Sequence, residues 1–402
     1  MFLLFMFIEV LIFAVLGIGL GIFFGLAPGL HPNLIVLMLP LFIATNIAAL
    51  PLLAFITALA ISNSIIDFIP SILLGAPDSG NELSILPGHK MLMKGMGYEA
   101  IKLTVIGGVG SIIFCVLLFS LIVFIIPALY ATAQPYIYLL LIFIVLIMVM
   151  TEKGKGKKLL ALFCFLLAGF IGMLSSELPI DNTLILFPIL SGLFGISFLL
   201  LQIKKKVSLP AQGRKELFVS RGLINRGVVF GSLGGVFSGL LPGVGSSEVA
   251  TLVSVDKNDH SFLVTVGALT TANIIMSILS LWLIGKSRSG AAVVIEQLMT
   301  VGLNEVLIIL SVGLVACGVA ALITLYLAKK FTAIIKRVNY SSISIAVIAI
   351  LVVLIFIFSG WYGLFLAAIC SCLGIAANLA GIKRGNLMGV LILPTILFYI
   401  GI

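Results

Sequence analysis

The stretch Gly25-Leu26-Ala27-Pro28-Gly29 returns as Gly239-Leu240-Leu241-Pro242-Gly243, and in both places a Pro–Gly pair interrupts a long apolar run. Proline ends a helix because it lacks an N–H donor, and glycine permits a sharp change of chain direction. The two copies lie 214 residues apart in a chain of 402 residues. They indicate an internal duplication in which each half contains one broken helix.

The composition around these breaks requires a lipid environment. Hydrophobic residues make up 62% of the chain and charged residues 9%, whereas a soluble globular protein carries about 25% charged residues. Soluble enzymes, disordered chains and disulfide-rich secreted folds are thereby excluded. The five cysteines lie in apolar runs without a metal-binding or redox spacing. We predict an all-α polytopic protein of the cytoplasmic membrane.

Apolar runs of about 20 residues predict the spanning helices. Two shorter apolar pieces, 33–45 and 244–255, each follow a Pro–Gly break and predict re-entrant hairpins. The predicted spans are 2–26, 47–75, 98–126, 135–151, 157–174, 183–202, 222–241, 261–285, 301–328, 341–358, 360–380 and 386–401.

The basic residues predict the orientation in the membrane. Of the 23 Lys and Arg residues, all but Lys286 and Arg288 lie in or next to one set of loops, which the positive-inside rule assigns to the cytoplasm. This distribution explains the net charge of +9 without a nucleic-acid partner. The cytoplasmic loops are 76–97, 152–158, 203–226, 256–260, 329–337 and 383–385.

Further matches follow the two breaks in the same order. Asn63 matches Asn273, and the loop 75–80 matches the loop 285–290. Later anchors are Gly97 with Gly302 and Gly172 with Gly374, and the offset falls from 214 to 202 along the chain.

Equivalent loops of the two halves carry opposite charge. The four lysines within 152–158 correspond to an uncharged turn at 359–360, and the acidic turn at 175–182 corresponds to the loop with Lys383 and Arg384. By the positive-inside rule the halves are inverted relative to each other. We predict a first repeat at 1–202, a basic linker at 203–221 and an inverted second repeat at 222–402. Each repeat has a broken hairpin and about five spans.

Inverted repeats with paired broken helices are typical of secondary transporters, which bind substrate between the repeats. After each break a half-helix begins, and its first N–H groups form an anion site. The alternative is that the breaks are close-packed kinks. Lys286 and Arg288 lie on the side of the membrane where the positive-inside rule does not predict them. Either they bind a carboxylate or phosphate, or they belong to a solvated loop. The candidate substrate-binding residues are Pro28, Gly29, His31, Asn33, Asn63, Ser79, Pro242, Gly243, Gly245, Ser246, Ser247, Asn273, Lys286, Ser287 and Arg288.

Acids inside apolar runs are candidates for cation coupling, because a charge in the membrane is costly unless it has a function. Glu248, close to the second break, and Asp67 are the candidates to bind H⁺ or Na⁺. The sequence contains no phosphate-binding loop and no metal-ligand cluster, so we expect no bound cofactor, no catalytic residue and no use of ATP.

The chain resembles the large membrane subunit of the tripartite tricarboxylate transporters over nearly its whole length. The resemblance rests on 25–29, on 75–80 followed by the motif at 86–95, on 239–245 and on the Gly-rich end at 385–394. It implies cation-coupled secondary uptake of carboxylates, with an extracytoplasmic binding protein or a small membrane subunit as partner.

The leading hypothesis is a secondary transporter of a small organic anion that works by alternating access around the paired breaks. The alternative is a flippase for a lipid-linked phosphate such as a polyprenyl phosphate. An intramembrane enzyme would need His31 to act with Ser246 or Glu248, and the inverted duplication argues against it. Membrane lipids and a second copy of the chain, as a homodimer, complete the expected partners.

Overall fold

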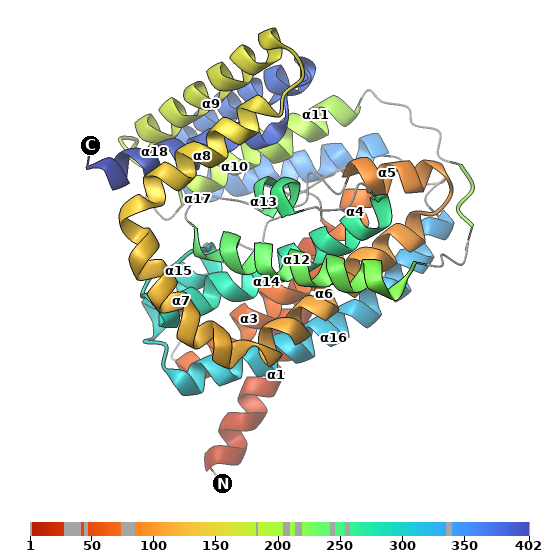
Figure 1. Ribbon diagram of the computed structural model, residues 1–402, viewed down its shortest axis with the longest axis vertical. Coiled ribbons are helices and arrows are strands. Elements are labelled where there is room, and N and C mark those ends of the chain that lie inside the picture. The colour runs from red at the N-terminus through yellow and green to blue at the C-terminus, as the bar shows by residue number, and fades with distance from the viewer. Residues whose placement is uncertain are drawn as a thin grey trace. The chain divides into compact units, whose positions relative to one another are not determined.

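A computed structural model describes most of the chain. The described residues are 2–27, 42–43, 47–73, 85–181, 184–203, 210–213, 219–241, 246–253, 258–334 and 340–401. All regular elements within these ranges are helices, as Figure 1 shows.

The described part of the first half of the chain forms a series of helices. η4 is a π-helical segment between α10 and α11, and η3 is a short 3₁₀ turn before α8. The bounds are α1 Phe2–Leu26, α3 Ala49–Ile66, α4 Phe68–Leu73, α5 Ile85–Met93, α6 Gly97–Leu117, α7 Phe119–Ala133, η3 Gln134–Tyr136, α8 Ile137–Met150, α9 Lys155–Ser175, α10 Leu186–Leu190, η4 Ser191–Ile196 and α11 Ser197–Ile203.

The second half follows a similar order. Its longest helix, α17, contains one non-helical residue, Gly360 (φ 60°, ψ −157°), at the predicted division between the spans 341–358 and 360–380. The bounds are α12 Arg221–Leu240, α13 Ser246–Val253, α14 Asp259–Ile284, α15 Gly290–Leu298, α16 Leu303–Ile334, α17 Tyr340–Leu379, η6 Arg384–Met388 and α18 Gly389–Ile400.

Nine helices in the described ranges are long and apolar enough to cross a membrane. Large apolar side chains such as Phe124, Leu117 and Trp361 are 74–81% exposed. A surface of this kind suits lipid and would be unstable in water. The prediction of an all-α polytopic membrane protein is confirmed.

Two predicted boundaries differ from the structure. The predicted span 98–126 is two helices, since α6 ends at Leu117 and Leu118 leaves helical geometry (φ −94°, ψ 10°). The predicted loop 76–97 contains the nine-residue helix α5, and α15 follows the equivalent loop in the second half. Both short helices have too few residues to produce a run of spanning length.

The chain folds into two compact units, and each unit contains segments of both predicted halves. The compact units therefore do not coincide with the predicted repeats 1–202 and 222–402, whose boundaries remain a prediction. The first unit is Met1–Pro127, Ser208–Leu240 and Val249–Val338, and the second is Ala128–Val207, Leu241–Glu248 and Asn339–Ile402.

Two helix pairs with glycine contacts dominate the first unit: α1 packs on α3, and α12 packs on α14. In each pair, three glycines spaced four residues apart remove the side chains that would hold the backbones apart. A Cβ on any of these glycines would meet a backbone carbonyl oxygen of the partner helix. The contacts are Gly17 with Phe55, Gly21 with Leu59, Gly25 with Asn63, Gly231 with Thr265, Gly235 with Leu269 and Gly239 with Asn273.

Glycine contacts also organise the second unit, where α9 packs on α18 and α17 packs on η4. Again each glycine lies against a carbonyl oxygen of the partner helix. The contacts are Gly172 with Val390, Gly374 with Leu193, Gly389 with Phe165 and Gly192 with Ala367.

Candidate functional site

Many of the predicted site residues fall outside the described ranges. For two more, Ser247 and Glu248 of α13, the structure describes the backbone alone. The site residues outside the described ranges are Pro28, Gly29, His31, Asn33, Ser79, Pro242, Gly243 and Gly245.

The helices that precede the two breaks end where the sequence predicts. α1 ends at Leu26, where the Ala27 N–H donates to Phe24 in a tighter turn, and α12 ends at Leu240. A new helix, α13, begins at Ser246, a few residues after the second break. Neither α1 nor α12 continues through its Pro–Gly pair. Whether the chain re-enters the membrane here remains a prediction.

Asn63 lies beside the end of α1. Its side chain is only 3% exposed, and a Cβ on Gly25 would lie 3.1 Å from its carbonyl oxygen. The Asn63 amide nitrogen has no hydrogen-bond partner among the described residues. A buried amide without a hydrogen-bond partner costs about 1–3 kcal/mol, so the presence of an asparagine at this position points to a binding role.

Asn273 occupies the corresponding place beside the end of α12. Its Nδ2 donates a 2.6 Å hydrogen bond to Ser238 Oγ, and a Cβ on Gly239 would lie 2.8 Å from its carbonyl oxygen. Ser238 is buried and comes from the last turn of α12. The structure thus places both predicted asparagines at the helix ends that precede the breaks.

Both asparagines also lie at the level where α6 and α16 contact the central helices. Gly108 of α6 contacts Ile65 and Thr271, which flank the two asparagines along α3 and α14. Gly313 of α16 contacts the other flanking pair, Ile61 and Ile275. The close packing allowed by these glycines holds α3 and α14 at a fixed register around Asn63 and Asn273.

Asp67 is the residue that caps α3, one turn beyond Asn63. It is 7% exposed, and its backbone nitrogen would lie 3.2 Å from a Cβ on Gly25. A predicted coupling acid is therefore buried next to the end of α1, in the same part of the first unit as Asn63.

The loop with the two exceptional cations folds back on α14. Gly285 ends this helix in the left-handed conformation (φ 62°), where glycine is favoured. Ser280 Oγ then donates to the Lys286 carbonyl at 2.7 Å, and Ser277 Oγ to Ser289 Oγ at 3.0 Å. Lys286 is exposed, whereas Ser287 and Arg288 are half-buried.

Three serines in this cluster were missed by the sequence analysis. Ser277 and Ser280 follow Asn273 at helical spacing on α14, and Ser289 accepts a 3.2 Å bond from the Ala292 N–H at the start of α15. Ser277 and Ser280 could have been found from the sequence by their helical spacing after Asn273. Ser238, directly before Gly239, could only be recognised from its contact with Asn273.

Ser246 is placed in a different unit from the asparagines. It is the first residue of α13, is 5% exposed, and belongs with Leu241–Glu248 to the second unit. Within the described residues, no group of three His, Cys, Asp or Glu side chains could hold a metal ion.

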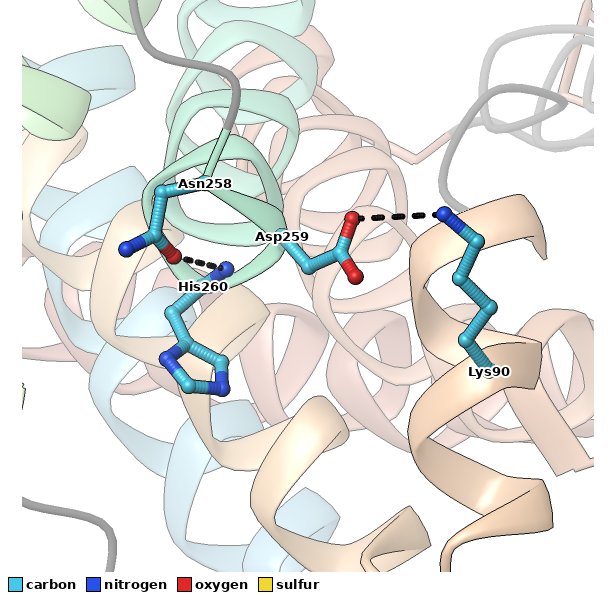
Figure 2. Close-up of polar contacts among 4 residues, drawn as sticks. All are labelled: Lys90, Asn258, Asp259 and His260. Carbon is cyan, nitrogen blue, oxygen red and sulfur yellow. Dashed lines mark hydrogen bonds and ion pairs between the residues drawn. The ribbon is translucent and has the colours of Figure 1, made fainter.

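A separate polar contact joins α5 to the start of α14, as Figure 2 shows. Lys90 Nζ lies 3.6 Å from Asp259 Oδ1, and both side chains are well exposed (61% and 38%). Asn258 Oδ1 accepts a 2.9 Å hydrogen bond from the His260 N–H and caps the helix. Exposed pairs of this kind contribute about 0–1 kcal/mol. Asp259 and Asn258 are therefore suitable control positions.

Comparison with known proteins agrees with this architecture. The chain is 31% identical to the uncharacterized protein MJ1079 of Methanocaldococcus jannaschii over 97% of the chain and 99% of the relative. No solved structure matches the chain.

Residues 11–389 match the Tripartite tricarboxylate transporter TctA family, and the match covers both Pro–Gly breaks, both asparagines and the loop 285–290. Members are transporters and not enzymes, and they reside in the cytoplasmic membrane. Membership implies transport of tricarboxylates or other carboxylates. The match covers most of the chain, which therefore belongs to the TctA family of tripartite tricarboxylate transporters.

Proposed function

We propose that this protein is a secondary active transporter of a small carboxylate, coupled to H⁺ or Na⁺. It works by alternating access between two inverted repeats, each with one broken helix. The duplicated glycine contacts carry this proposal, because the same helix-to-helix register occurs twice in each compact unit.

The helix pairs of the first unit support the duplication residue by residue. Each of the three glycine contacts between α1 and α3 has a counterpart between α12 and α14, with α1 offset by 214 residues and α3 by 210. Gly25 against Asn63 thus corresponds to Gly239 against Asn273. Two unrelated helix pairs would share neither the offset nor the register.

The second unit supports a two-fold relation between the halves. α9 and the later part of α17 are equivalent at an offset of 202, and η4 and the start of α18 at an offset of 197. α9 of the first half packs on α18 of the second, and α17 of the second half packs on η4 of the first: Gly172 lies against Val390, and Gly374 against Leu193. A two-fold axis that relates the two halves produces such a pair of equivalent, crossed contacts.

The charges on the loops indicate how this axis lies. Equivalent loops carry opposite charge, so the positive-inside rule favours an axis in the membrane plane, that is, inverted repeats. Transporters built in this way hold the substrate where the repeats meet, at half-helix ends. The breaks after α1 and α12 are the corresponding ends in this chain.

The amides of the two breaks remain predicted anion ligands, and the first unit offers further polar groups of the same kind. Asn273, Ser277 and the loop with Lys286 and Arg288 supply donors and positive charge. Asp67 and Glu248 are the proposed coupling acids. A small membrane subunit, an extracytoplasmic binding protein and a homodimer remain predictions about the partners.

A counterflow screen in proteoliposomes tests the function. Vesicles loaded with one unlabelled di- or tricarboxylate should accumulate its labelled form transiently, because exchange requires only a carrier that alternates. Gly243→Leu should abolish counterflow, since a leucine side chain would block access to the break. Absence of counterflow for every carboxylate tested would contradict the proposal. Full counterflow by Gly243→Leu would contradict the site alone.

A further inference from the structure

Asn63 and Asp67 lie one turn apart on the face of α3 that packs on α1. The equivalent positions on α14 are Asn273 and Ser277. The two faces therefore share an asparagine and differ at the next turn, where only the α3 face carries a carboxylate.

The α3 face is buried and carries one carboxylate and one amide side chain. Asp67 is 7% and Asn63 3% exposed, and both adjoin Gly25 in the last turn of α1. The final carbonyl groups of a helix lack intrahelical partners and carry the negative end of its dipole. Pro28, which follows this turn in the sequence, has no N–H to donate to them.

The Asn63 side chain can supply one further oxygen atom. It makes no hydrogen bond within the described part of the chain, and its amide nitrogen is buried. Rotation about its last torsion exchanges the amide oxygen and nitrogen, so either can face a ligand. Asp67, one turn further along α3, supplies a carboxylate, and the end of α1 lies against the backbone of both residues; a carboxylate and a helix carbonyl end both favour a cation.

The α14 face has the opposite chemistry. The Asn273 amide is fixed by Ser238, and Ser277 is bonded to Ser289. The adjoining loop carries Lys286 and Arg288, where the first half has Ala76 and Asp78 in the sequence. Hydroxyl and amide donors with two cations are ligands for an anion.

We infer that the α3 face binds the coupling cation, that this cation is Na⁺, and that the α14 face binds the carboxylate. The assignment of roles rests on the proposed function. Carboxylate, amide and backbone carbonyl oxygens are the ligands of hard cations, and the carbonyl ends of broken helices coordinate Na⁺ in other transporters. A proton would need only Asp67, whereas Na⁺ makes use of Asn63 and the helix end as well.

Thermal unfolding of the purified full-length protein in NaCl and in choline chloride tests the Na⁺ site without a known substrate. A cation that binds only the folded protein raises its melting temperature. NaCl should raise the melting temperature of the unchanged protein above its value in choline chloride. Asp67→Asn should need roughly tenfold more NaCl for the same rise, or show none. Asn63→Ala should weaken the effect in the same direction.

Asp259→Asn is the matched control, since it makes the same chemical change at an exposed position of the first unit (Figure 2). It should keep the original response to NaCl. If Asp67→Asn fails to fold, Asn63→Ala decides the question, and an unchanged NaCl requirement there overturns the inference. Equal melting temperatures in NaCl and choline chloride for the unchanged protein overturn it as well.

Transport separates this inference from the proposed function. Asp67→Asn should still exchange carboxylate in counterflow but lose acceleration by an inward Na⁺ gradient. Arg288→Gln should weaken carboxylate affinity and leave the Na⁺ requirement unchanged. Counterflow that persists without any response to Na⁺ overturns the cation assignment and spares carboxylate transport. Loss of all counterflow by the unchanged protein overturns the function itself.

Discussion

Asn273 of α14 donates a 2.6 Å hydrogen bond to Ser238 of α12, two residues before α12 ends. The bond fixes the Asn273 amide against the last turn of α12. In the first half, Phe24 stands at the position equivalent to Ser238, and the amide nitrogen of Asn63 has no such partner among the described residues. The repeats are thus alike in backbone packing and different in polar chemistry.

Asn273→Ala should weaken carboxylate binding. Removal of an amide that donates to a charged ligand, or orients a group that does, costs about 1.5–3 kcal/mol, which corresponds to roughly a tenfold or larger rise in the half-saturating concentration. Counterflow at a series of carboxylate concentrations measures this. Asn258→Ala, on the same helix but at its exposed start, is the control. Equal half-saturation for the two variants would remove Asn273 from the site.

Gly21→Leu should destabilise the protein strongly, because a Cβ at Gly21 would meet Ser62 Oγ and the Leu59 carbonyl. Overpacking a close helix contact costs about 1–3 kcal/mol or more. Gly19→Leu on the same helix is a closely matched control, since a Cβ there meets nothing within 4 Å. The melting temperature in detergent should fall for Gly21→Leu and stay level or rise for Gly19→Leu. Equal melting temperatures would contradict the packing of α1 on α3.

Glu152→Ala should loosen the second unit. The buried Glu152 carboxylate accepts bonds from the Lys383 N–H at 2.8 Å and from Asn386 Nδ2 at 3.0 Å, and so joins the loop after α8 to η6. Hydrogen bonds to a charged group contribute about 1.5–3 kcal/mol. Proteolysis of the α8–α9 loop should accelerate in this variant. Glu177→Ala, at an exposed turn, serves for comparison and should leave the rate unchanged.

The helix breaks could be predicted from the sequence because they are local. Pro28 and Pro242 cannot donate within a helix, so α1 and α12 end just before them. The division of α17 at Gly360 could also be predicted, because it too depends on a single residue. The nine-residue helices α5 and α15 escaped prediction, because short apolar stretches in polar loops resemble turns as much as helices.

The composition of the compact units depends on contacts between distant residues. Gly107 of α6 lies against the Val264 carbonyl, and Gly267 of α14 against the Thr104 carbonyl, so helices of different halves share one core. A glycine pattern indicates close packing without naming the partner. The Ser238–Asn273 bond was hidden for the same reason, although the asparagines themselves could be matched by their spacing.

Side-specific cysteine labelling tests the inverted arrangement of the halves most directly. Ser176→Cys and Lys383→Cys, each introduced singly after replacement of the exposed Cys372, occupy equivalent loops of the two halves and are both exposed. We expect a membrane-impermeant maleimide added to intact cells to label Ser176→Cys, and to label Lys383→Cys only after the membrane is opened. Labelling of both from the same side would contradict inverted repeats and the alternating-access mechanism that depends on them.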